Sequence, residues 1–120
     1  MMKLIKNMDQ SIDSNKIDKS FHFSPLTLEQ IRQMHDDFVM KRNWEQFHQP
    51  RNILLALIGE LGEIAENFQW KPDSYCDNGL TKWTEKERNA LADELSDVLI
   101  YLIRLSDRCR IDVSKTICKN

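Results

Sequence analysis

The sequence predicts an all-α protein, an antiparallel helical bundle. Two long segments, near residues 50–70 and 84–108, repeat apolar residues at helical spacing, and no segment alternates as a strand would. The 120 residues include only three glycines and three prolines, so few breakers interrupt these segments. The length suits one domain, which we place at residues 25–120 behind a polar, aperiodic leader, residues 1–24, that we expect to be flexible.

The first predicted helix begins at Thr27, where Gln30 three residues later completes a capping-box pattern. Its apolar face carries Leu28, Ile31, His35 and Phe38. Residues 42–50 have weak helical periodicity and predict a loop. Pro50 suits the first turn of the next helix, which we expect to reach about Trp70.

The second half predicts one long and one short helix. Pro72 starts a loop to residue 82, whose turn residues are Asp77, Asn78 and Gly79. Thr84 and Glu87 form another capping box, and the helix that follows extends to about Arg108. Asp112 can cap a last short helix, Val113 to about Lys119.

Two carboxylate pairs at i,i+3 spacing lie in matching positions on the two long helices. The apolar stripe of the first helix consists of Ile53, Leu54, Leu57, Leu61, Ile64 and Phe68. The stripe of the second consists of Leu91, Leu95, Val98, Leu99, Leu102 and Leu105. Glu60 and Glu94 lie at the rims of these stripes, and Glu63 and Asp97 lie about 60° further round. Packing stripe against stripe would bring the four carboxylates together.

Four carboxylates at one edge of a core repel unless a cation neutralises them. Their oxygens suit Mg²⁺ or Mn²⁺ and do not suit zinc. Two solvated acidic edges are the alternative for either pair alone, and the matching positions favour the metal. Di-iron helical proteins carry Glu-x-x-His motifs, and no histidine follows these glutamates at i+3.

Several neighbours of the acidic pairs have two interpretations. Gly59 and Gly62 indicate either close helix packing or access for a ligand. Glu66 is a third ligand, a general base for water, or a surface charge. Arg104 and Arg108 either offset phosphate charge or, as we favour, lie on a solvated helix edge.

An aromatic group accompanies the acidic helices. Trp44, Phe47 and His48 precede the first one, Trp70 lies at its end, and Tyr101 lies one turn after Asp97 on the second. The group predicts a slot that stacks a planar base; the alternative is that Trp44 and Trp70 close the ends of a small core. A histidine on an apolar face, such as His35, is more often a packing residue. A metal beside an aromatic pocket indicates a nucleotide phosphate substrate, whose oxygens magnesium would bridge.

Composition excludes several classes. The net charge of −2, with both signs interspersed, gives no basic surface for nucleic acid. No apolar run approaches a membrane span or the core of a signal peptide. The three cysteines (Cys76, Cys109, Cys118) form no Cys-x-x-Cys pair, so we expect a reduced, cytosolic protein.

Two stretches carry a resemblance to a known family: WEQFHQPRNILLALIGELGEIAENFQWK (residues 44–71) and ELSDVLIYLIRLSDRCRIDV (residues 94–113). They resemble the dCTP pyrophosphatase branch of the MazG-like all-α NTP pyrophosphatases, from about Phe21 onwards. The resemblance implies magnesium-dependent hydrolysis of dCTP, and of 5-modified dCTP, to the monophosphate and pyrophosphate. The family's metal motif falls on Glu60, Glu63, Glu94 and Asp97.

The resemblance also assigns the substrate contacts. These correspond to His35, to the segment Trp44, Glu45, Gln46, Phe47 and His48, and to Trp70 and Tyr101. It implies a homotetramer, with which the extra apolar residues Ile100 and Ile103 agree. Similar proteins continue beyond Asn120 with polar and basic residues, including an asparagine that contacts substrate, so we expect the printed sequence to lack that part of the site. A non-catalytic nucleotide-binding or protein-interaction module is the other function considered.

Overall fold

The computed structural model describes residues 18–119, and this part of the chain is all helical, as predicted. Its elements are α2 (Leu28–Lys41), the 3-10 turn η1 (Glu45–Phe47), α3 (Pro50–Gln69), the 3-10 turn η2 (Asp73–Tyr75), α4 (Glu85–Arg108) and α5 (Val113–Lys119). Residues 18–24, the described part of the predicted leader, form no helix, and residues 1–17 lie outside the described range.

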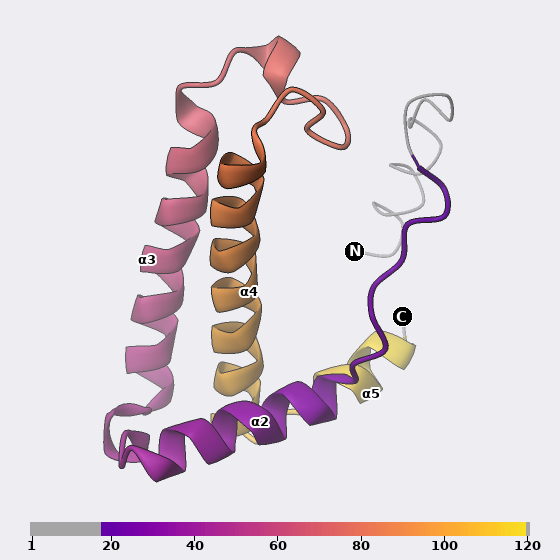
Figure 1. Cartoon of the computed structure of the whole chain (residues 1–120). Coiled ribbons are helices and arrows are strands. Elements are labelled where there is room, and N and C mark those ends of the chain that lie inside the picture. Colours follow the sequence, from indigo (N-terminus) through magenta and orange to yellow (C-terminus); the bar gives the residue numbers. More distant parts are fainter. Residues whose placement is uncertain (1–17, 120) are drawn as a thin grey trace.

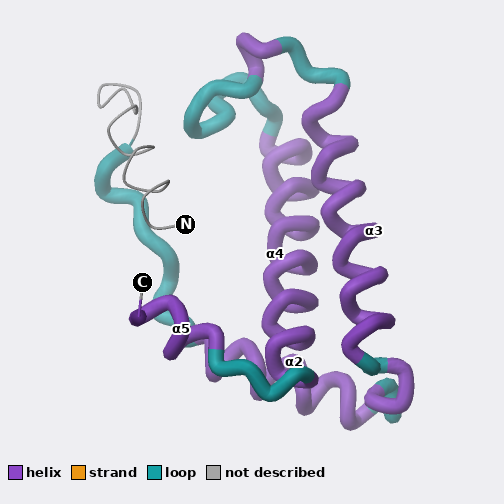
Figure 2. Tube along the Cα trace, turned by 180° about the vertical axis from the view of Figure 1, so that it is seen from behind, coloured by secondary structure: helices purple, strands orange, loops and turns teal. Residues whose placement is uncertain are grey.

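Helices α3 and α4 form an antiparallel pair, and α2 crosses the end of the pair where α3 begins and α4 finishes (Figure 1). The same arrangement is seen from behind in Figure 2, where the connections into and out of α3 and α4 lie at the two ends of the pair. The interior is small and draws on every long helix: its buried residues are Val39, Ile53, Leu57, Trp83, Leu91 and Ile103. The sequence therefore predicted the pairing of the two acidic helices correctly.

Side-chain caps fix where the helices begin. Thr27 and Gln30 form the predicted capping box at α2, and Thr84 and Glu87 form the one at α4. The Asp112 carboxylate accepts a hydrogen bond from the Lys115 amide at 2.9 Å, which caps α5. The two predicted loops differ from expectation only in containing the short turns η1 and η2.

Trp83, a residue to which the sequence patterns assign no role, packs at the end of the helix pair where α3 finishes and α4 begins. Trp83 is buried, its ring lies 5.0 Å from that of Phe68, and its Nε1–H donates to the Tyr75 carbonyl at 2.7 Å. These contacts attach the α3–α4 connection to the helix pair.

Much of the apolar surface stays outside. From the predicted stripes, Leu54 and Leu61 of α3 and Leu95, Leu99 and Leu102 of α4 are exposed. Ile103, expected on an additional apolar surface, is only 6% exposed and belongs to the core, because α2 covers that side of α4. The outward apolar face thus includes two of the six stripe residues of α3 and three of the six of α4. No helix within residues 18–119 is long and apolar enough to cross a membrane.

Candidate functional site

The four predicted carboxylates come from the facing sides and edges of α3 and α4. Glu60 and Glu94 are half-buried between the helices, whereas Glu63 and Asp97 are exposed at their edge. Burial raises the pKa of the Glu60 carboxyl, and the charges of Glu63, Asp97 and Glu94 raise it further. The charges of both acidic residues of α4 thus act on Glu60 of α3, as expected for matching positions on the two helices.

We call Glu60, Glu63, Glu94 and Asp97 the acidic group. Its members lie near one another but do not enclose a site. Glu60 Oε2 is buried without a hydrogen-bond partner. Yet within residues 18–119 no three His, Cys, Asp or Glu side chains form a ready-made metal site. The two observations are compatible, because like charges hold carboxylates apart until a cation compensates them.

Asn67 joins the acidic group and was missed from the sequence. Its Nδ2 donates to the Glu94 carboxylate across the helix pair and to the Glu63 carbonyl at 2.9 Å. It orients one acidic side chain from α4 against the backbone of α3. Its position, seven residues after Glu60 on the face toward α4, was the available signal.

The glycines beside the carboxylates do not serve packing within this chain. A Cβ atom on Gly59 or Gly62 would meet nothing within 4 Å. The surface of α3 beside Glu60 and Glu63 is therefore open to a ligand or another molecule. Glu66, the third acidic residue along this helix, is exposed.

A pocket of about 540 Å³ between α2 and α4 begins beside the acidic group. It brings together Asp97 and three predicted substrate contacts, His35, Trp44 and Tyr101. The rings of His35 and Tyr101 meet edge to face with centroids 6.5 Å apart. A carboxylate and several aromatic rings thus share one cavity of a size suited to a small molecule.

The remaining predicted contacts lie elsewhere. Trp70 caps the far end of α3 and is 85% exposed, and Phe47 is also exposed. Gln46 donates through Nε2 to the Asn43 carbonyl at 3.1 Å, while Glu45 is half-buried with Oε2 lacking a partner. The alternative that Trp44 and Trp70 close a core is wrong, because Trp44 too is 45% exposed.

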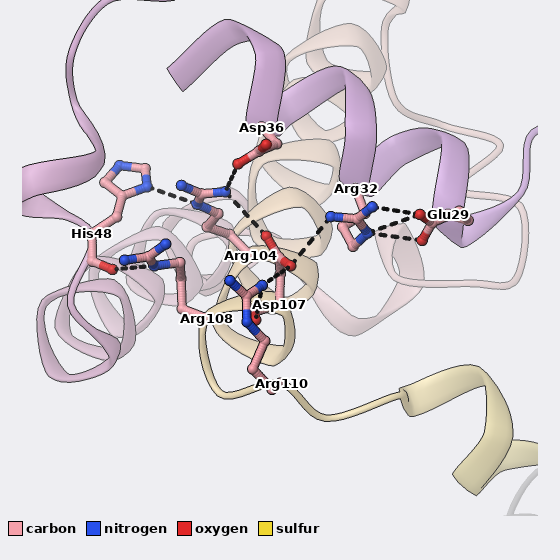
Figure 3. A network of polar contacts seen from close by, with 8 residues as sticks. All are labelled: Glu29, Arg32, Asp36, His48, Arg104, Asp107, Arg108 and Arg110. Carbon is pink, nitrogen blue, oxygen red and sulfur yellow. Dashed lines mark hydrogen bonds and ion pairs between the residues drawn. The ribbon is translucent and has the colours of Figure 1, made fainter. Parts of the chain in front are cut away.

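A buried charge network lies at the C-terminal end of α4 (Figure 3). Arg104 is only 2% exposed, so its expected place on a solvated edge is wrong. Its Nη1 donates to Asp36 Oδ1 at 2.6 Å and to Asp107 Oδ2 at 3.1 Å. Asp107 is buried as well and also accepts from Arg32 and Arg110. We call Asp36, Arg104 and Asp107, with Arg32 and Arg110, the arginine network. A helical wheel shows which residues share a face, but not that α2 would cover this one.

His48 links the arginine network to the loop before α3. Its Nδ1 accepts from Arg104 Nε at 3.0 Å, and its carbonyl accepts from Arg108 Nε at 3.1 Å. Arg108 too is half-buried, so its predicted place on a solvated edge is also wrong. The rings of His48 and His35 lie 6.1 Å apart. Burial lowers the pKa of each imidazole, and the Arg104 charge lowers both further. His35 Nδ1 is buried without a partner, so the alternative of a satisfied packing histidine does not apply to it.

The donor chemistry of the acidic group fits a hard divalent cation. All four side chains offer only oxygen atoms, and the unpartnered Glu60 Oε2 has an unmet requirement for positive charge. Glu60, Glu63, Glu94 and Asp97 are the residues that would hold it.

Comparison with known proteins identifies relatives of this arrangement. Residues of the chain are 60% identical over 94 positions to human dCTP pyrophosphatase 1, and 56% identical over 101 positions to the bovine protein of that name. These matches cover 78% and 83% of the chain, respectively. The chain is a relative of the dCTP pyrophosphatases. It spans only 54% and 58% of the length of these two proteins.

The fold of this dCTP pyrophosphatase relative is also found in a solved structure. The crystal structure of a pyrophosphatase from Archaeoglobus fulgidus matches it with a TM-score of 0.66 and 26% identity, over 83% of this chain and 90% of the other. The MazG-like fold expected from the sequence is therefore confirmed. No protein-family model matches the chain.

Proposed function

We propose that this chain hydrolyses dCTP to dCMP and pyrophosphate with Mg²⁺, which Mn²⁺ can replace, and that it acts on 5-modified dCTP as well. The observation that carries the proposal is the position of Asp97, which belongs to the acidic group and also lines the aromatic pocket. A nucleoside triphosphate could therefore place its phosphates at the acidic group and its base in the aromatic pocket at the same time. The names of the relatives support the choice of dCTP.

The acidic side chains would bind the cation, and the cation would neutralise phosphate oxygens and acidify the attacking water. Asn67 keeps Glu94 turned toward α3, so that carboxylates from both helices face one region. Glu66 or one of the four ligands would accept the proton of the water, which attacks the α-phosphorus. The leaving group is then pyrophosphate.

The pocket would hold the nucleoside. Trp44 offers a ring for stacking, and Tyr101 would pack under the sugar, where a ribose 2′-hydroxyl would clash. Stacking does not distinguish bases, so polar groups must meet the amino and carbonyl edge of cytosine. His35, which lines the pocket and has an unpartnered Nδ1, would supply one such group, whereas Gln46 and His48 do not line the pocket and would have to reach the base from the η1 turn. We therefore expect dCTP to be preferred over CTP and dTTP.

The active form is a homotetramer in this proposal. Trp44 and Trp70 flank opposite ends of the 20-residue helix α3, about 30 Å long, so one chain does not close a slot between them. A neighbouring copy would bring its Trp70 to the pocket and cover the exposed leucines of α3 and α4. Three free, exposed cysteines suit the reducing cytosol proposed as its location.

Pyrophosphate release is the decisive measurement. Purified chain is assayed with dCTP, 5-methyl-dCTP, CTP and dTTP, with Mg²⁺ or with excess chelator, and the initial products are separated. We expect dCMP and pyrophosphate, formed only with the metal. Initial release of dCDP and orthophosphate, or full activity in chelator, would overturn the proposal. Nucleotide binding without turnover would instead indicate the non-catalytic module.

A further inference from the structure

His48 is held at two points by arginines one helical turn apart. Arg104 Nε donates to its ring at Nδ1 and Arg108 Nε donates to its carbonyl oxygen, at 3.0 and 3.1 Å (Figure 3). Both arginines belong to α4, which also carries Asp97 and Tyr101. His48 directly follows the turn η1. The two contacts therefore fix that turn against the helix of the acidic group.

The ring contact determines the protonation of His48. A guanidinium has only N–H donors and does not deprotonate in proteins. His48 Nδ1 must therefore present its lone pair, which places the proton of the neutral ring on Nε2. A protonated ring would lose this hydrogen bond and put two cations in contact. The lowered pKa of His48, caused by burial and by the charges of Arg104 and Arg108, agrees with a neutral ring.

Arg104 is itself immobilised. Its guanidinium is buried, bonds to Asp36 of α2 and Asp107 of α4, and is thereby fixed between two helices. Asp107 in turn is held by Arg32 at 3.3 Å and by Arg110 at 3.1 Å. The ionisable groups around the His48 ring are Arg104 and Arg108 on α4 and His35 on α2.

We propose that Arg104 is a positioning residue of the nucleotide pocket: it fixes His48 as the neutral Nε2–H tautomer and, with Arg108, fixes the η1 turn on α4. The Nε2–H of His48 is then a hydrogen-bond donor of fixed direction for an acceptor atom of the nucleotide. Arg104 does not itself touch the substrate. The kinetic part of this inference rests on the proposed function, whereas the tautomer does not.

Nitrogen NMR of the ligand-free wild type tests the tautomer directly. With ¹⁵N-labelled histidine, and His48→Gln to assign its signals, we expect Nδ1 unprotonated and Nε2 protonated at pH 7, with a titration midpoint below the ordinary 6.5. In Arg104→Gln the midpoint should rise and the two tautomers should mix. A proton on Nδ1 in the wild type would overturn the proposal, and this result needs no variant to fold.

A double-mutant cycle tests the positioning role. Arg104→Gln should raise KM for dCTP about tenfold, because one charge-assisted hydrogen bond is lost. Its kcat should stay within about twofold of the wild-type value. In the His48→Ala background the same change should alter KM by less than about twofold. Arg88→Gln, an exposed arginine near the start of α4, is the matched control and should leave KM unchanged.

Additive effects, or a fall in kcat with unchanged KM in both backgrounds, would show that Arg104 only maintains the fold and would overturn the proposal. Failure of the proposed function gives a different result. The wild type would then hydrolyse no nucleotide, and the kinetic role of Arg104 would fall with it. An active wild type with the wrong tautomer would overturn the Arg104 proposal alone.

Discussion

The middle and the C-terminal end of α4 carry buried charge in opposite ways. At the arginine network, Arg104 is surrounded by Asp36 and Asp107, so unlike charges compensate one another inside the chain. At the acidic group, Glu60 is surrounded by carboxylates and its Oε2 has no partner. The first arrangement balances its charges within the chain, although Arg104 Nη2 has no hydrogen-bond partner, whereas the second places like charges together. The contrast separates charge that maintains the structure from charge kept available for a ligand.

The largest expected effect comes from opening the arginine network. Asp107→Ala removes the acceptor shared by Arg32, Arg104 and Arg110 and leaves Asp36 as the carboxylate bonded to Arg104. Removing one partner of a buried pair costs about 3–5 kcal/mol, which urea unfolding measures as a lower midpoint at constant slope. The control is Asp93→Ala, an exposed aspartate of the same helix, expected within about 0.5 kcal/mol of wild type. A loss below about 1 kcal/mol for Asp107→Ala would show that the network is not needed for stability.

The acidic group should respond in activity and not in stability. Glu63→Gln and Asp97→Asn remove exposed charges, so unfolding should change little. If each side chain holds the cation, kcat should fall at least ~10²-fold, equivalent to about 2.7 kcal/mol at the transition state. Asp93→Asn serves again as the control, assayed at saturating Mg²⁺. Wild-type turnover in either variant would remove that residue from the metal site.

The sequence predicted the helices well because the information is local. Thr27 with Gln30 and Thr84 with Glu87 are hydrogen-bonded pairs within one turn, and Pro50 begins α3 as expected. The matching wheels also place Glu60 within electrostatic reach of Glu94 and Asp97, because each pair is defined within its own helix.

The contacts of Arg104 and Asn67 could not be read in the same way. Arg104 is buried by α2 and bonded to a loop histidine 56 positions away, so its role depends on how α2 crosses α4. Asn67 reaches Glu94 across 27 positions. Trp44 and Trp70 were expected to share a slot because both adjoin α3, but a helix separates residues at its two ends. In the proposed homotetramer a neighbouring copy would bring the two together, and helical periodicity does not encode such a contact.

A smaller effect should appear in the metal response of the fold. Without metal, Glu60 is disfavoured in its charged form by burial and by Glu63, as its raised pKa shows. Glu60→Gln should therefore raise Tm in chelator and reduce the rise in Tm that Mg²⁺ gives the wild type. Asp37→Asn, an exposed acidic change on α2, is the control and should preserve the Mg²⁺ response. An unchanged metal response in Glu60→Gln would mean that Glu60 does not contribute to the site.

The smallest expected effect is a pH dependence of opposite sign at the two regions, measured in chelator. His35 has a lowered pKa in the fold because of burial and Arg104, so the unfolded chain binds more protons below pH 6.5. Its contribution to stability is therefore present above 6.5 and is lost as the pH falls through the lowered value.

Glu60 gives the reverse sign. Its pKa is raised above 4.5 in the fold, so the folded state holds the proton more tightly, and its penalty grows as the pH rises from 4.5 through the raised value. Subtracting the unfolding free energy of His35→Gln from that of the wild type should give a difference that increases from pH 5 to pH 7. The same subtraction for Glu60→Gln should give one that decreases with pH from 4.5 upward. Burial favours the neutral form of both residues, so the slopes differ in sign because His35 is a base and Glu60 is an acid, and two curves of the same sign would contradict these pKa directions. If the acidic group binds Mg²⁺ as proposed, adding the metal should remove the slope for Glu60 and leave that for His35.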